Sequence, residues 1–168
     1  ELVVSDIDIQ QRDLQANAYG KGFGKRLMNH IEKIAKSIDV SRMSLEACRT
    51  GGYFWATRGY DFDFRGEFYK DEASEARDKA MKNLARQFVW NPRVIDMEIF
   101  PEDFSIDKKD LDSLCETFMT EVESGRIRTP SNAVQFGKDK PFLYKGEQTW
   151  FGKFASIGSG WRGTKSLG

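Results

Sequence analysis

The sequence is poor in the residues that build disulfide frameworks and metal sites. Cysteine occurs twice, at Cys48 and Cys115, and the one histidine is His30. Two distant cysteines argue against a disulfide-stapled scaffold and favour a reducing compartment, so we predict a cytoplasmic protein. One histidine and no CxxC pair give little support to a metal centre or to a Ser-His-Asp triad. We therefore expect no metal cofactor.

Long apolar runs are also missing. No stretch of about 18 apolar residues exists, which argues against a membrane-spanning helix and a membrane partner. The first residues, Glu1-Leu2-Val3-Val4, lack the basic and apolar regions of a signal peptide, and they lack a methionine. We accordingly expect a processed or excised chain.

Charge is balanced over the whole chain but not along it. The 26 basic and 26 acidic residues give a net charge of +0, which argues against binding to nucleic acid or membrane through bulk charge. Residues 126–168, however, hold eight basic and two acidic residues, so an acidic body precedes a basic, aromatic-rich end. A length of 168 residues with 39% hydrophobic residues predicts one domain, or one domain with an extension.

The first third of the chain has the pattern of a βαβ unit. We expect a strand over residues 2–10, a glycine-rich loop, a helix from residue 23 to about residue 39, and a strand over residues 40–48. A short helix over residues 53–58, ended by Gly59, and a strand over residues 60–64 follow. The expected inward face of the long helix is Phe23, Leu27, Ile31, Ile34 and Ile38.

The rest of the chain is predicted to be mainly helical. We expect helices over residues 67–88 and 107–124, the second ended by Gly125, and a third that begins at Thr129-Pro130 and stops at Gly137. Residues 95–99 alternate as a short strand, with a helical turn as the alternative. Residues 138–168 have the composition of a hairpin or irregular structure. The fold class is therefore α+β. The expected inward residues of the two long helices are Ala73, Ala76, Ala80, Leu84 and Phe88, and Leu111, Leu114, Cys115, Phe118 and Val122.

The loop Tyr19-Gly20-Lys21-Gly22-Phe23-Gly24-Lys25 lies between an expected strand and an expected helix. Glycines there leave backbone amides exposed, and the helix start adds unpaired N–H groups and a positive dipole end. This arrangement suits a diphosphate. The alternative is a tight turn in which the glycines serve packing alone. The spacing fits neither a Walker loop nor a GxGxxG dinucleotide fingerprint.

This loop resembles the acyl-CoA loop of the GNAT superfamily of N-acyltransferases. Gly22 and Gly24 match the two glycines of the pattern Arg/Gln-x-x-Gly-x-Gly/Ala, and Gly59-Tyr60 matches the end of a later motif. The resemblance covers residues 1–64 as an acyl-CoA-binding core with a mixed sheet and flanking helices. The superfamily's earlier strands and helices are missing, so either they were lost by truncation or the extension over residues 65–168 completes the domain.

The resemblance implies an N-acyltransferase that moves an acetyl or similar acyl group from coenzyme A (acetyl-CoA) to an amine. The coenzyme-binding residues would be Tyr19, Gly20, Lys21, Gly22, Phe23, Gly24 and Lys25. Two departures stand out. Tyr19 replaces the usual Arg or Gln, and Trp55 occupies the position where many members carry the tyrosine that protonates the leaving thiolate.

Three residues are candidates for the acid–base chemistry. Asp8, which shares a strand face with Asp6, or Glu46 on the next strand could accept the proton of the attacking amine. The alternative for each is a solvated carboxylate on an exposed strand face. Tyr53 is the phenol that could reach the sulfur, and packing or adenine contact are its alternatives.

The basic end permits a different function. Trp150-Phe151-Gly152-Lys153-Phe154 and Trp161-Arg162-Gly163-Thr164-Lys165 interleave aromatic rings with cations, as in proteins that stack on bases and neutralise phosphates. The alternative hypothesis is therefore an acyltransferase-like module with impaired chemistry, which docks nucleic acid or a partner protein through residues 126–168. If instead this segment completes the domain, Trp150 and Trp161 are core residues.

Overall fold

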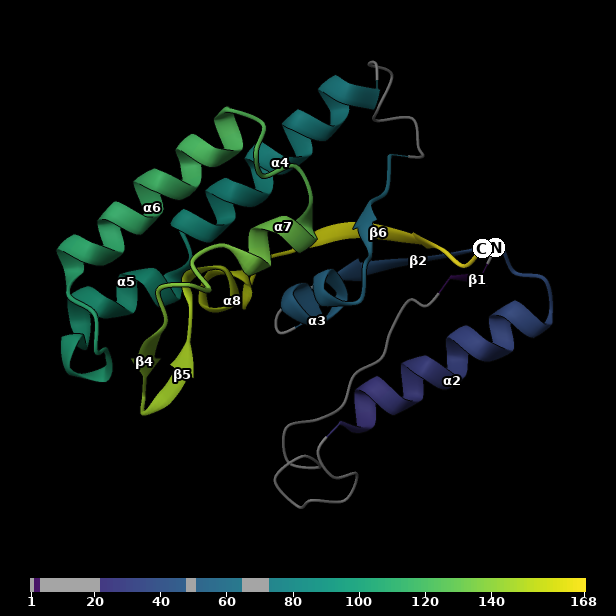
Figure 1. The fold of residues 1–168 in the computed structure, drawn as a ribbon, viewed down its shortest axis with the longest axis horizontal. Helices are drawn as coiled ribbons and strands as arrows, with labels where there is room; N and C mark the ends of the chain where they lie inside the picture. The colour runs from purple at the N-terminus through teal and green to yellow at the C-terminus, as the bar shows by residue number, and fades with distance from the viewer. Residues whose placement is uncertain (1, 4–21, 48–50, 65–72) are drawn as a thin grey trace. The chain divides into compact units, whose positions relative to one another are not determined.

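The computed structural model describes residues 2–3, 22–47, 51–64 and 73–168. It is a mixed α+β structure that divides into two compact units (Figure 1). Unit 1 comprises residues 1–45 and 164–168, and unit 2 comprises residues 46–163. The division does not coincide with the boundary at residue 64 that the resemblance suggests, because strands β2 and β6 each run from one unit into the other.

Unit 1 contains a parallel strand pair joined by a helix. Strand β1 (Leu2–Val3) pairs with β2 (Arg42–Ala47), with Leu2 opposite Met43, and helix α2 (Phe23–Ser37) lies between them in the chain. On the other side of β2 lies the end of β6 (Trp161–Ser166), where the Thr164 hydroxyl donates to the carbonyl of Met43 at 3.2 Å. The predicted βαβ unit is thus confirmed, while residues 4–10 of its first strand lie outside the described residues.

The inward face of α2 differs from the prediction. Ile34 and Ile38 are 60% and 64% exposed, whereas Met28 and Ala35 are buried. Glu32 lies between Met28 and Ala35 on the helix surface, and it forms an ion pair of 3.1 Å with Lys165. The buried side of α2 is therefore the side that faces β6. Helix α2 therefore carries more large apolar side chains than it buries.

Unit 2 begins with the predicted short helix and strand. Helix α3 (Gly51–Thr57) ends before Gly59, whose φ of +81° confirms the expected glycine cap. Strand β3 (Asp61–Phe62) follows, and beyond its end the amide of Asp63 donates to the carbonyl of Arg162 in β6 at 3.0 Å. The last strand of the chain is thereby inserted next to β3.

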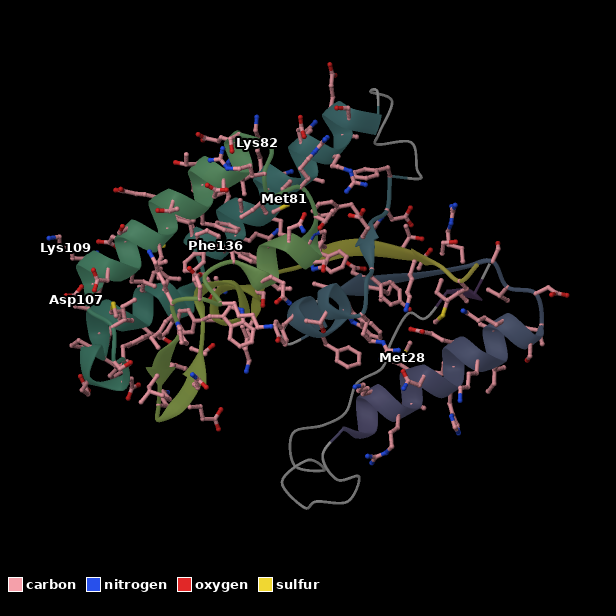
Figure 2. The ribbon with its side chains drawn as sticks, in the orientation of Figure 1. Met28, Met81, Lys82, Asp107, Lys109 and Phe136 are labelled. Atoms are coloured by element: carbon pink, nitrogen blue, oxygen red, sulfur yellow. The ribbon has the colours of Figure 1, made fainter. Side chains whose placement is uncertain are left out.

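Two long helices form the main helical layer of unit 2. They are α4 (Ala73–Val89) and α6 (Lys108–Glu123), and they meet where the rings of Phe88 and Phe118 stack at 5.4 Å. All five predicted inward residues of α6 are buried, and Gly125 ends it with a φ of +74°. On α4, Met81 is buried and its neighbour Lys82 is exposed (Figure 2), as expected for an amphipathic helix.

The segment between these helices is helical rather than extended. Helix α5 spans Pro92–Ile99, and a 3-10 turn over Pro101–Asp103 follows it. The prediction of a strand over residues 95–99 was therefore wrong, and its helical alternative holds. Proline fits the first turn of a helix, because the backbone N–H that it lacks would form no hydrogen bond within the helix there. Ile95 and Ile99 are four residues apart and exposed on one side, while Met97 is buried.

The C-terminal third is more regular than predicted. Helix α7 (Pro130–Gln135) begins as expected, with the Thr129 hydroxyl accepting the amide of Asn132. Strands β4 (Phe142–Tyr144) and β5 (Glu147–Thr149) form the expected hairpin. Helix α8 (Phe151–Ser156) and strand β6 were not expected. The buried Asn91 side chain fixes the end of α8 by donating to the carbonyls of Ala155 and Ile157, both at 2.8 Å.

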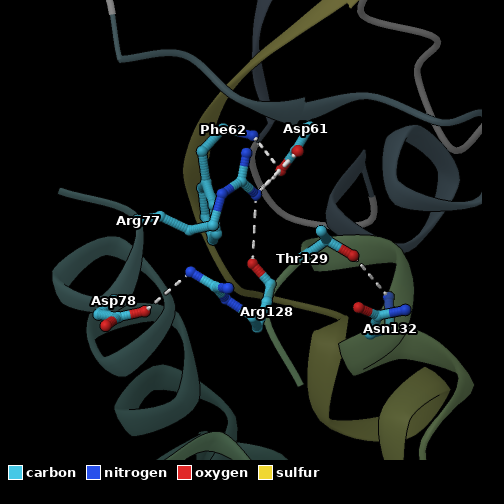
Figure 3. A network of polar contacts seen from close by, with 7 residues as sticks. All are labelled: Asp61, Phe62, Arg77, Asp78, Arg128, Thr129 and Asn132. Carbon is cyan, nitrogen blue, oxygen red and sulfur yellow. Dashed lines mark hydrogen bonds and ion pairs between the residues drawn. The ribbon is translucent and has the colours of Figure 1, made fainter. Parts of the chain in front are cut away.

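A polar network connects β3 to the helical layer (Figure 3). Arg77 of α4 forms an ion pair of 2.8 Å with Asp61 and donates to the carbonyl of Arg128 at 3.3 Å. The guanidinium of Arg128 in turn lies 3.7 Å from Asp78. Arg77 also lies over the ring of Phe64, 5.1 Å from its centre. These contacts give α4 a polar attachment to β3 beside the hydrophobic core.

Candidate functional site

Gly22 begins the described part of the glycine loop. Its φ is +80° and ψ is 9°, a left-handed conformation, and it is the residue immediately before α2. Its carbonyl accepts the amide of Arg26 at 3.0 Å, which is the first hydrogen bond of the helix. Side chains with a Cβ atom strongly disfavour this conformation. The backbone at this position thus favours glycine over residues with a Cβ atom by about 1–2 kcal/mol.

The first turn of α2 is suited to an anion. Its early amides have no carbonyl partner within the helix. Among the described residues no side chain caps them, and the turn contains no acidic residue. Lys25 is exposed in the same turn, and it adds positive charge to the dipole end. Gly24 is the second helical residue. Tyr19, Gly20, Lys21 and the side chain of Phe23 lie outside the described residues, so the coenzyme-binding set is seen only from Gly22 onward.

Of the two candidate proton acceptors, Asp8 and Glu46, the structure describes only Glu46. Asp8 lies outside the described residues. Glu46 is exposed on β2, and it alternates with Leu45 and Ala47, which are buried. The side chain of Glu46 is therefore open to solvent, as either a base or a solvated carboxylate would be.

Tyr53 lies half-buried on α3, where desolvation raises the pKa of its phenol. A phenol with a raised pKa keeps its proton at neutral pH, so Tyr53 can donate a proton but does not serve as a base. Its ring meets the indole of Trp150 edge-on, with the ring centres 6.1 Å apart. The structure thus places a protonated phenol beside an aromatic side chain of the basic end.

Trp55 and Tyr60 serve packing. The two rings meet edge-on at 5.3 Å, and Tyr60 is 1% exposed. The side chain of Tyr60 therefore belongs to the core. Trp55, four residues before Gly59, brings an indole to the position where the resemblance implies a tyrosine, and an indole has no acidic proton to give at neutral pH.

A group of side chains that sequence reasoning did not bring together surrounds Trp150. The ammonium groups of Lys138 and Lys153 lie 5.6 and 5.3 Å from the centre of its indole ring, and Lys153 also lies 5.8 Å from the ring of Tyr53. We call Tyr53, Lys138, Trp150 and Lys153 the Trp150 cluster. The aromatic and basic pattern of residues 150–154 indicated Trp150 and Lys153 as candidates for binding. Nothing in the sequence linked Tyr53 or Lys138 to this segment.

Half of the cations of the basic end form ion pairs within the described part of the chain. Four of its eight cations pair with carboxylates: Arg126 with Glu121, Arg128 with Asp78, Lys145 with Asp103, and Lys165 with Glu32. In the described part of the chain, Lys138 and Lys153 have no carboxylate within ion-pair distance. The uncompensated charge of the segment therefore includes the two lysines that flank Trp150.

Unit 2 also contains a cavity of about 700 Å³ between the first half of α6 and the segment that joins α7 to β4. Asp107, Asp110 and Asp139 line it with Lys140 as their counter-charge, and Leu114 and Phe142 contribute apolar surface. None of the predicted site residues that the structure describes lines this cavity. In the parts of the chain that are described, no cluster of three His, Cys, Asp or Glu could hold a metal ion.

Comparison with family models found no match, and comparisons with curated proteins and with solved structures found none either. Among the described helices, none has the length and apolar character needed to cross a membrane. Support for a function comes from the chain's own residues alone.

Proposed function

We propose that the protein is an N-acyltransferase of GNAT type, which moves an acetyl or similar acyl group from coenzyme A to an amine. The observation that carries the proposal is the left-handed Gly22, which immediately precedes the first turn of α2 in a unit whose strands β1 and β2 are parallel. A glycine forced into this conformation at a helix start leaves the amides free to approach a diphosphate.

The order of elements supports the same proposal. After the loop come α2, β2, α3 ended at Gly59, and β3, which is the order of elements predicted for the segment that resembles the superfamily. The buried Tyr60 supports the match of Gly59-Tyr60 to the later motif. We include a cytoplasmic location in the proposal, because Cys115 is a free thiol and acyl-coenzyme A is a soluble donor.

The chemistry requires one proton acceptor and one proton donor. The amine nitrogen attacks the thioester carbonyl, the bond from carbonyl carbon to sulfur breaks, and the amine loses a proton to Asp8 or Glu46. The departing thiolate takes a proton from the phenol of Tyr53, which is protonated at neutral pH as phenols ordinarily are. Backbone amides would stabilise the charge that develops on the carbonyl oxygen.

Titration with acetyl-CoA tests this proposal. We expect calorimetry to show binding, and we expect Gly22→Val to abolish it because the β-branched side chain opposes the left-handed conformation. Gly146→Val is the matched control, since Gly146 has a φ of +78° in the β4–β5 turn and no atom lies within 4 Å of its Cβ position. The two variants carry similar backbone strain. No binding at millimolar acetyl-CoA, or equal loss in both variants, would reject the proposed site.

The alternative, an acyltransferase-like module that docks a partner through residues 126–168, also has a supporting observation. Trp55 removes the usual acid of the superfamily, and the Trp150 cluster gathers two cations around an aromatic pair. Under this alternative we place the interaction at the Trp150 cluster, because its two lysines pair with no carboxylate in the described part of the chain.

A further inference from the structure

The indole of Trp150 is held in place by three helices. Its Nε1 donates to the carbonyl of Val134 in α7 at 2.7 Å, and Trp150 is itself the residue immediately before α8. The ring of Tyr53 from α3 meets it edge-on. Helices α3, α7 and α8 are mutually packed in unit 2. The ring is therefore fixed before any ligand arrives, which lowers the entropic cost of binding.

The cluster remains accessible to a ligand. Lys138 is exposed, and Tyr53, Trp150 and Lys153 are half-buried. The ammonium group of Lys138 also donates to the side-chain oxygen of Gln135 at 3.3 Å. Gln135 is neutral, so this hydrogen bond leaves the charge of Lys138 uncompensated. Both ammonium groups are held near the ring by cation–π attraction, which is worth about 0.5–1 kcal/mol at exposed sites. Such a weak contact yields readily to a phosphate.

From this arrangement we propose that the Trp150 cluster binds single-stranded nucleic acid, with a base against the aromatic pair and the adjoining phosphates against Lys138 and Lys153. Single strands are bound without sequence preference by aromatic platforms combined with positive charge. Such a role goes beyond acyl transfer. It also gives a role to the two lysines at this ring, which pair with no carboxylate in the described part of the chain.

An acidic protein segment is the competing occupant, and the two differ in their use of the ring. A glutamate-rich peptide satisfies the ammonium groups but has no aromatic group to place against the indole. A nucleic acid strand uses both. Loss of binding on removal of the ring therefore distinguishes the two partners.

Fluorescence anisotropy with a labelled 15-nucleotide oligothymidylate measures this binding. For the full chain we expect affinity to fall with rising salt. In the double variant Lys138→Gln/Lys153→Gln the slope of log K against log salt should be smaller by about 1.4, since each contact with a single strand contributes about 0.7. The matched control is Lys109→Gln/Lys140→Gln, which removes two exposed lysines outside the cluster and should leave the slope near that of the original chain.

Removal of the ring gives the second measurement. We expect Trp150→Ala to weaken binding roughly 5- to 150-fold, the range for base–aromatic stacking. A melting curve checks that this variant is folded, because the change also removes the bond to Val134. If it unfolds, Trp150→Phe, which keeps a smaller ring, should weaken binding by a smaller factor.

Several results would overturn the proposal. They are no binding of the oligonucleotide, an unchanged salt slope in the Lys138/Lys153 variant, or competition by polyglutamate as strong as that by unlabelled oligonucleotide. Acetyl-CoA titration of the same lysine variant separates this site from the proposed active site. Unchanged acetyl-CoA binding is expected. A joint loss of acetyl-CoA and oligonucleotide binding would assign the cluster to the nucleotide part of the coenzyme instead.

Discussion

Replacement of Gly152 by alanine tests the close packing of α8 on α7. A Cβ atom at Gly152 would lie 2.8 Å from the carbonyl carbon and the oxygen of Val134, and it would also overlap the carbonyl oxygen of Ala133. These are all backbone atoms, so no side-chain rotation can make room. The two short helices must move apart to accept one methyl group.

The expected cost follows from two opposing effects. Overpacking of a well-packed site costs about 1–3 kcal/mol, and a clash with rigid backbone belongs at the upper end, near 3 kcal/mol. Alanine in place of a helical glycine contributes about 1 kcal/mol in the opposite direction. The net loss should be about 2 kcal/mol, which lowers the Tm of a chain of this size by roughly 4–8 °C.

Urea unfolding followed by tryptophan fluorescence is the appropriate assay. All four tryptophans lie within residues 46–163, so the signal reports on unit 2. Gly160→Ala is the matched control, because its Cβ would meet the carbonyl of Ala47 at an ordinary 3.5 Å, and its stability should stay within about 0.5 kcal/mol. A Gly152→Ala variant as stable as the original chain, or stabilised by the propensity gain, would refute the close approach.

Three further predictions concern unit 2. The pKa of Cys115 is raised to about 11 by burial, so between pH 9 and 11 the unfolded chain loses this thiol proton while the folded chain keeps it. Stability should therefore fall as pH rises through that window, and the fall should be smaller in Cys115→Ala, measured in a Cys48→Ser background by urea unfolding. Asn91→Ala should cost about 2–3 kcal/mol, because it leaves two carbonyls at the end of α8 without their donor, and a melting temperature within 2 °C of the original would contradict this. Asp61→Asn should cost about 1 kcal/mol by removing the ion pair with Arg77, and a cost that does not shrink in 0.5 M salt would show that charge is not its source.

The helices with strong local signals were predictable from the sequence. In α6, the apolar period and the terminating Gly125 agree with each other, and the structure follows them to within a residue or two. The position of Gly22 before α2 was predictable for a similar reason, since a glycine between a strand and a helix indicates special backbone geometry. Local chemistry determines these features, so they need no knowledge of the remaining chain.

Features determined by distant contacts were not predictable. The buried side of α2 carries Glu32, whose partner Lys165 comes more than 100 residues later in the chain. Helical periodicity alone could not identify which side of α2 is buried, because apolar residues cover a wide part of its surface. Helix α8 is short and contains Gly152, which lowers its intrinsic helix propensity, so packing against α7 must stabilise it. The Trp150 cluster unites Tyr53 with Lys138 and Lys153 through the packing of three helices. No spacing rule connects such positions.

The composition of unit 1 has a consequence for the order of folding during synthesis. Residues 164–168 belong to the same compact unit as residues 1–45, whereas unit 2 is one continuous segment between them. On the ribosome the amino-terminal residues emerge first, yet they must wait for the end of β6 before their sheet has its third strand. If unit 2 folds beforehand, it brings the two distant ends of its segment to fixed positions and shortens the loop that unit 1 has to close. Folding of unit 2 would then lower the entropic cost of folding unit 1, although most of unit 1 is synthesised first.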